Sequence, residues 1–293
     1  MDHPVIAGVE DPADAADAAD AVDWAADEAG LRGARLHLVH AWLWEPHQAP
    51  ASLDAQAARR AGEEALDVLA QRVRDRHPEL EVASGVVDAS PRDALVALSA
   101  AGQLLVLGPR GSGGFRGLLV GSTALHATAH AACPVVVYRA AQPAPGADGG
   151  PRGGVVVGVH GREPSDGVLS FAFETARRRL LPLRAVHAWS FPLVLGAGHA
   201  LPPVYEESHV AGEEDRLLAE VLAGWRAKYP EVPVTEDVVR SGPARRLVDL
   251  SQEQQLVVVG RHGEPRGAFG RLGSVSQAVV QHAHCPVAVV PAD

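Results

Sequence analysis

The sequence predicts an α/β protein built from two similar units, each a parallel β-sheet with helices on both faces. Short apolar runs alternate with longer amphipathic stretches along the 293 residues, which is typical of parallel strands joined by helices. The same segments then occur a second time in the same order. A stretch rich in Pro, Gly and Ala at 140–154 separates the two copies and predicts a linker.

The elements of the first copy follow from its apolar spacing and its capping residues. After a first strand at 4–9, Asp11 can cap a helix that has Pro12 in its first position, and we expect Gly30 to end that helix. A second strand at 35–41, a long helix at 54–76 and a third strand ending near Val87 come next. Ser90 then precedes the third helix. The fourth strand is expected at 104–107, the fourth helix from Ser122, and the fifth strand at 134–138. In the second copy, the first, second, fourth and fifth strands are expected at 155–159, 183–188, 256–259 and 286–290.

Composition excludes several classes of function. A net charge of −10, from 26 basic and 36 acidic residues, argues against nucleic acid or an anionic membrane as a partner. Cys133 and Cys285 occupy equivalent places in the two copies, form neither a disulfide framework nor a metal cluster, and are expected to be small core residues. The amino terminus lacks the pattern of a signal peptide, and no apolar run is long enough to cross a membrane. We therefore expect a soluble, cytoplasmic protein.

A duplicated glycine motif carries the functional prediction. The pattern G-x2-G-x9-G-S follows the fourth strand of each copy, first at Gly108, Gly111, Gly121 and Ser122, then at Gly260, Gly263, Gly273 and Ser274. Glycines let backbone N–H groups approach an anion, and a helix N-terminus adds its positive dipole end, so the pattern indicates phosphate binding. It is not a Walker A loop, because the sole lysine, Lys228, lies elsewhere, and neither first β–α turn carries a Rossmann fingerprint.

At these residues the chain resembles the universal stress protein family, in its tandem two-domain, actinobacterial-like form and its ATP-binding branch. The resemblance rests on Gly8-Val9, on His40-Ala41, on the glycine motif and on the closing His-Ala-x-Cys-Pro-Val. It implies a flavodoxin-like (Rossmann-like) sheet of order 3-2-1-4-5 in each domain, with domains at 1–141 (unit one) and 153–293 (unit two) and a linker at 142–152. It also implies ATP, with or without Mg²⁺, across strands one and four, a role in the stress response, a homodimer and an unidentified regulatory protein partner.

The resemblance also assigns candidate nucleotide-binding residues in each unit. In unit one they are Gly8, Val9, Glu10, Ala41, Leu107, Gly108, Arg110, Gly111, Gly114, Gly121, Ser122 and Thr123. In unit two they are Gly158, Val159, His160, Ala188, Val259, Gly260, His262, Gly263, Gly273, Ser274 and Val275. The family usually has Asp at the end of strand one, where Glu10 and His160 stand in this chain. Because His160 removes a carboxylate, we expect weaker nucleotide binding in unit two.

Other polar residues are interpreted as structural. We expect His40 and His187 to be hydrogen-bonded framework residues, and Arg177–Arg179 to form a solvated helix end beside the helix dipole. His126 and His130 share a helix face, but no third metal ligand is evident. The sequence offers no catalytic constellation or dedicated base, so any ATP hydrolysis is expected to be slow. Two alternatives to a nucleotide-binding regulator remain open: a weak ATPase or adenylate-type hydrolase, and a scaffold whose sites are vestigial.

Overall fold

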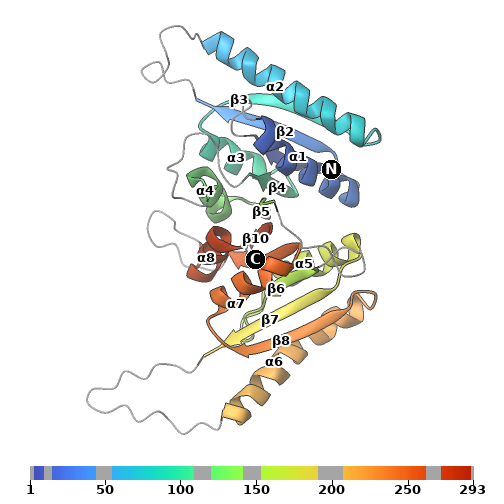
Figure 1. Cartoon of the computed structure of the whole chain (residues 1–293), viewed down its shortest axis with the longest axis vertical. Coiled ribbons are helices and arrows are strands. Elements are labelled where there is room, and N and C mark those ends of the chain that lie inside the picture. Colours follow the sequence, from blue (N-terminus) through green and yellow to red (C-terminus); the bar gives the residue numbers. More distant parts are fainter. Residues whose placement is uncertain are drawn as a thin grey trace, which may run out of the picture.

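The computed structural model describes residues 3–9, 15–43, 55–108, 120–140, 153–190, 207–261 and 272–291. Strands and helices alternate through both units (Figure 1). Unit one contains β1 (Val5–Gly8), α1 (Ala15–Arg32), β2 (Leu36–Trp42), α2 (Ala55–Arg76), β3 (Val82–Asp88), α3 (Pro91–Ser99), β4 (Leu104–Leu107), α4 (Ser122–His130) and β5 (Val135–Val137). Unit two contains β6 (Val155–Gly158), α5 (Asp166–Arg179), β7 (Leu183–Trp189), α6 (Glu207–Lys228), β8 (Val234–Arg240), α7 (Pro243–Leu250), the short 3-10 helix η2 (Ser251–Glu253), β9 (Leu256–Arg261), α8 (Ser274–His282) and β10 (Val287–Pro291).

The strands form one continuous ten-stranded sheet of order β3-β2-β1-β4-β5-β10-β9-β6-β7-β8. Within each unit the order is 3-2-1-4-5 and every pairing is parallel, which confirms the predicted fold class. The units join where β5 and β10 pair antiparallel, with Val136 opposite Ala288. Because the strand order is the same when read from either end, the two units are related by a pseudo-two-fold axis at this seam (Figure 1).

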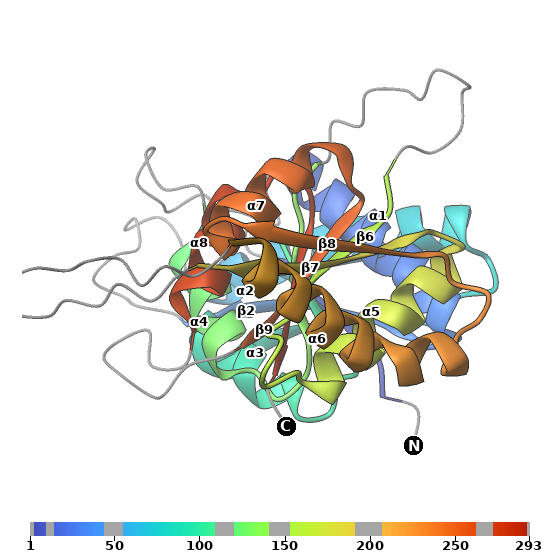
Figure 2. The ribbon, with the colours of Figure 1, turned by 90° about the horizontal axis from the view of Figure 1, so that it is seen from below.

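Helices cover both faces of the sheet, and the buried side chains group by face. One apolar cluster combines α1, α2, α5 and α6 with strand residues such as Val5 and Ala7; a second combines α3, α4, α7 and α8 with residues such as Ile6. Figure 2 shows α4, α7 and α8 on one side of the sheet and α1 and α5 on the other. Each cluster runs through both units, so the buried side chains of the two units form continuous layers.

Most element boundaries lie within two residues of the predicted ones, and Ser90 caps α3 by accepting a hydrogen bond from the Asp93 N–H. The end predicted for α1 at Gly30 is wrong, because the helix continues to Arg32. Gly33, at φ +60°, takes the left-handed position, and the Ala34 N–H bonds to the Ala29 carbonyl at 2.9 Å. Leu180 ends α5 in the same way at φ 54°, without the freedom of glycine. The predicted cap at Asp11 and Pro12 lies outside the described residues.

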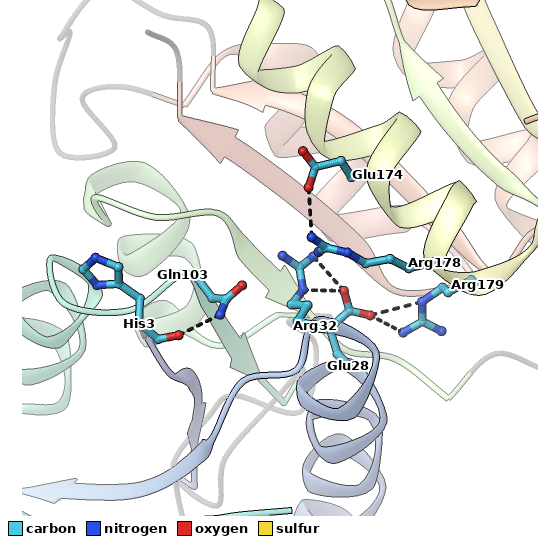
Figure 3. A network of polar contacts seen from close by, with 7 residues as sticks. All are labelled: His3, Glu28, Arg32, Gln103, Glu174, Arg178 and Arg179. Atoms are coloured by element: carbon cyan, nitrogen blue, oxygen red, sulfur yellow. Dashed lines mark hydrogen bonds and ion pairs between the residues drawn. The ribbon is translucent and has the colours of Figure 1, made fainter. Parts of the chain in front are cut away.

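A buried ionic cluster joins the units where α1 meets α5 (Figure 3). The Glu28 side chain is 2% exposed and accepts hydrogen bonds from Arg32 Nε at 2.7 Å and from Arg179 Nη2 at 2.6 Å. The guanidinium of Arg179 lies over the ring of Trp24, and that of Arg32 lies over Phe171. Arg179 is therefore part of the interface between the units, and the prediction that it belongs to a solvated helix end is wrong.

The residues of this cluster in unit one have counterparts of similar type in unit two, with one exception. When the ends of α1 and α5 are aligned on Gly33 and Leu180, Arg32 corresponds to Arg179 and Trp24 to Phe171. At the position of Glu28, however, α5 carries Thr175, which is 1% exposed. One carboxylate from unit one therefore binds one arginine from each unit.

Candidate functional site

The candidate site of unit one lies at the carboxyl edge of the sheet, where β1 and β4 end side by side. Gly8, the last residue of β1, is in register with Leu107, the last residue of β4. The helices that follow these two strands, α1 and α4, pack on opposite faces of the sheet. Open α/β sheets bind their ligands beyond the carboxyl ends of the strands, at the point where the connections change face in this way. The same arrangement recurs at β6 and β9 in unit two.

In each unit, a histidine from the neighbouring strand holds the turn that follows the first strand, which is β1 in unit one and β6 in unit two. The Val9 N–H donates to the Val39 carbonyl at 2.8 Å, and Nδ1 of His40 lies 2.8 Å from the Val9 carbonyl. In unit two, Nδ1 of His187 lies 3.1 Å from the Val159 carbonyl. Because a carbonyl oxygen accepts, Nδ1 carries the proton in both bonds. The prediction that His40 and His187 are framework residues is confirmed.

The helices that follow β4 and β9 start at glycines. Gly121 and Gly273 are the N-caps of α4 and α8, and among the described residues no side chain caps either N-terminus. By contrast, Ser90 and Ser165 cap α3 and α5 with their hydroxyls. The first N–H groups of a helix have no intrahelical partner, so α4 and α8 offer these donors, together with the positive dipole end, to an anion. The exposed hydroxyls of Ser122 and Ser274 stand beside them.

Close packing explains two of the glycines. A Cβ on Gly8 would lie 2.5 Å from Cδ2 of Leu107, so a larger residue at the end of β1 would require the Leu107 side chain to move. A Cβ on Gly260 would lie 3.1 Å from Cγ2 of Val168. In unit two the Ser276 hydroxyl also donates to the Gly260 carbonyl at 2.6 Å, which ties the first turn of α8 to the end of β9. Ala124 occupies the equivalent place in α4 and has no hydroxyl.

The structure brings most of the predicted residues to these two edges. In unit one, Gly8, Val9, Ala41, Leu107 and Gly108 lie at or beside strand ends, and Gly121, Ser122 and Thr123 start α4. In unit two the corresponding residues are Gly158, Val159, His160, Ala188, Val259 and Gly260, with Gly273, Ser274 and Val275 starting α8. Six predicted residues lie outside the described residues: Glu10, Arg110, Gly111, Gly114, His262 and Gly263. Nucleotide binding by any of the predicted residues, inside or outside the described ranges, stays a prediction.

A difference between the two units that the sequence analysis missed lies in the residue that contacts the histidine beside the turn after the first strand. In unit two, Nε2 of His187 lies 2.9 Å from the carboxylate of Glu214, which is also 3.7 Å from Arg162. The equivalent residue in α2 is Gly62, where an added Cβ would lie 3.1 Å from Cδ2 of His40. Aligning the two long helices, which have 22 residues each, exposes this exchange of glycine for glutamate. A partly buried carboxylate therefore supports the β6–α5 turn in unit two, where the equivalent position in unit one is a glycine.

The remaining polar candidates are structural in character. Burial raises the pKa of both the Cys133 and Cys285 thiols to about 12, so neither is a nucleophile near neutral pH. The rings of His126 and His130 stack at 4.2 Å, and burial, with His130 and Arg92 nearby, lowers the pKa of His126.

Among the described residues no group of three or more His, Cys, Asp or Glu could hold a metal ion. No described helix is long and apolar enough to span a membrane.

The fold and the edge geometry define a tandem α/β protein with a flavodoxin-like sheet in each half and, beside the strand ends of each half, a helix that starts at a glycine N-cap. Comparison with known proteins makes this specific: the model of the universal stress protein family matches residues 3–139 and 153–291. The chain belongs to the universal stress protein family.

Relatives and solved structures agree with this assignment over the full length. The chain is 38% identical over 298 residues to a universal stress protein of Mycobacterium tuberculosis, covering 97% of this chain and 95% of that protein. It is 36% identical over 296 residues to one of Mycolicibacterium smegmatis, covering 98% and 96%. A crystal structure of a universal stress protein from Archaeoglobus fulgidus superposes with a TM-score of 0.65 at 14% identity, covering 98% of this chain and 96% of that one, which shows the shared fold.

Proposed function

We propose that this protein binds ATP at the carboxyl ends of β1 and β4 in unit one and of β6 and β9 in unit two. The nucleotide would act as a regulatory ligand in the stress response. The observation that carries the proposal is the pair of helix starts, α4 and α8, which have glycine N-caps and no side-chain cap from the part of the chain that the structure describes. Three phosphates of ATP match the donors of such a helix start and the glycine loop before it.

The phosphates and the adenosine part of the nucleotide would contact different residues. The phosphates would accept hydrogen bonds from the first N–H groups of α4 and from the hydroxyls of Ser122 and Thr123, with Ser274 in the same role in unit two. Adenine and ribose would lie against the first turn, at Val9 or Val159, where Glu10 or His160 follows. Losing one charged hydrogen bond costs about 1.5–3 kcal/mol, so the site with His160 would bind about tenfold or more weakly.

The direct test is titration calorimetry of the purified chain with ATP, preceded by mass spectrometry of any small molecule released on denaturation. Two transitions are expected in the wild type. Ser122→Glu and Ser274→Glu should each remove one of them, because a carboxylate at the helix start repels phosphate but suits the helix dipole and the exposed position. Ala244→Glu is the matched control, because it adds the same charge to the first turn of α7, outside the proposed site.

The outcomes separate the candidate functions. Binding that is unaffected by Ser122→Glu and Ser274→Glu would contradict the proposed location. No bound nucleotide and no heat of binding would favour a scaffold with vestigial sites. Release of many ADP molecules per chain would make the protein an ATPase.

A further inference from the structure

Two arginines cross the seam between the units and cap the helices that start the candidate phosphate sites. Nη1 of Arg261, the last residue of β9, donates to the carbonyl of Ala131 in unit one at 2.6 Å. In the other direction, Nη2 of Arg139 donates to the carbonyls of Val280 and Gln281 in unit two at 2.7 and 2.8 Å. Ala131 is the C-cap of α4, and Val280 and Gln281 form the last turn of α8.

These contacts act on the C-terminal ends of α4 and α8, where a cation is favourable. The carbonyls of the last turn lack intrahelical partners and carry the negative end of the helix dipole. Figure 1 shows α4 and α8 beside the β5–β10 seam, and Figure 2 also shows the two helices close together. The position of each helix, and with it the N–H groups at its other end, is therefore fixed in part by a side chain from the other unit.

Arg261 differs from Arg139 in its place along the chain. Arg261 directly follows Gly260, the first glycine of the unit-two motif, whereas Arg139 follows β5 and is part of no glycine loop. The Gly260 carbonyl in turn accepts the hydroxyl of Ser276 in the first turn of α8. A continuous path of contacts thus runs from the start of α8, through Gly260 and Arg261, to the C-cap of α4.

We infer that Arg261 couples the two nucleotide sites: occupancy of unit two fixes the end of β9, holds Arg261 against Ala131 and thereby orders α4 for phosphate binding in unit one. This inference rests on the proposed function. It gives Arg261 a positioning role, and thermodynamic linkage requires that unit one favour binding in unit two by the same factor.

The coupling factor follows from three titrations with ATP, of the wild type and of two single-site variants. Ser274→Glu gives the affinity of unit one alone, and Ser122→Glu gives that of unit two alone. The product of the two wild-type association constants, divided by the product of these single-site constants, is the coupling factor. We expect a factor of at least about fivefold in the wild type, at the lower end of measured allosteric couplings.

Arg261→Met should reduce the factor to one, because it removes the guanidinium and keeps the length of the side chain. Arg139→Met is the matched control: it removes the same kind of inter-unit cap but should leave the coupling factor unchanged. A wild-type factor of one, or an equal factor in Arg261→Met and the wild type, overturns the inference.

A second measurement works without any ligand and separates failure of the coupling from failure of nucleotide binding. Amide hydrogen exchange in the last turn of α4, at 128–131, should become several-fold faster in Arg261→Met and not in Arg139→Met. Arg139→Met should instead accelerate exchange in the last turn of α8. Unchanged exchange at 128–131 in Arg261→Met overturns the positioning role, whether or not ATP binds.

Discussion

Replacing Glu28 with Gln should be among the most destabilising single changes in this protein. The carboxylate is 2% exposed, and the side chains of its partners Arg32 and Arg179 are 7% and 15% exposed. Gln keeps the shape but removes the charge, so two guanidinium groups stay buried with a neutral partner. Removing one member of a buried ionic group typically costs about 3–5 kcal/mol, and we expect that loss in the free energy of unfolding measured by urea denaturation.

Glu174→Gln is the matched control for this measurement. Glu174 also binds an arginine of α5, Arg178, at 3.1 Å, but its side chain is 36% exposed. A partly exposed pair of this kind is much closer to solvent than Glu28, and surface pairs contribute about 0–1 kcal/mol, so the control should differ from the wild type by about 1 kcal/mol at most. If Glu28→Gln and Glu174→Gln cost the same, burial does not determine the strength of the cluster, and the reasoning is refuted.

The same carboxylate makes the stability of the fold depend on pH in acid. Burial acts to raise the pKa of Glu28, but the charges of Arg32 and Arg179 outweigh it and hold the pKa below its usual value. Because the folded-state pKa is lowered, the stabilisation is present above the unfolded value of about 4.3 and is lost as pH falls below it. The difference in unfolding free energy between the wild type and Glu28→Gln should be constant from about pH 6 to 8 and shrink below about pH 4.3.

Two further predictions concern the helix end and the cysteines. Leu180→Gly should raise the unfolding free energy by about 1 kcal/mol, because Leu180 is 90% exposed and has a left-handed backbone at φ 54°. Leu31→Gly, at an exposed position inside α1, should lower the unfolding free energy by about 1 kcal/mol. A lower unfolding free energy in both variants would contradict the argument. Cys133 and Cys285 should react with a thiol reagent at pH 8 only after denaturation, because burial raises both pKa values to about 12; fast labelling of the native protein would show that the thiols are accessible.

Local patterns sufficed for the elements of each unit, whereas the strand order was implied by the family resemblance. The apolar run at 104–107 is β4, and Ser90-Pro91 starts α3, because burial of short runs and helix capping depend on neighbouring residues. The end of α1 was misplaced because Gly30 and Gly33 are equally suitable for a helix terminus in the sequence. Only the geometry of the turn, with φ +60° at Gly33, decides between them.

Contacts between the units could not be predicted in the same way. Glu28 is one acidic residue among many in α1, and nothing near it in the sequence points to Arg179, which is 151 positions away. The antiparallel pairing of β5 with β10 likewise depends on which apolar edges meet in space. The contrast between Gly62 and Glu214 was within reach of the sequence, since it needed only an alignment of the two long helices.

The single carboxylate at the α1–α5 contact shows what joining two halves in one polypeptide permits. In a dimer of identical chains, every residue near the two-fold axis occurs twice, so a glutamate there would bring a second negative charge into the same buried space. Here one half supplies Glu28 and the other Thr175, and two arginines share one acid. Duplication within a gene thus frees each copy to change alone, and an arrangement inaccessible to any symmetric assembly becomes a heritable part of the fold.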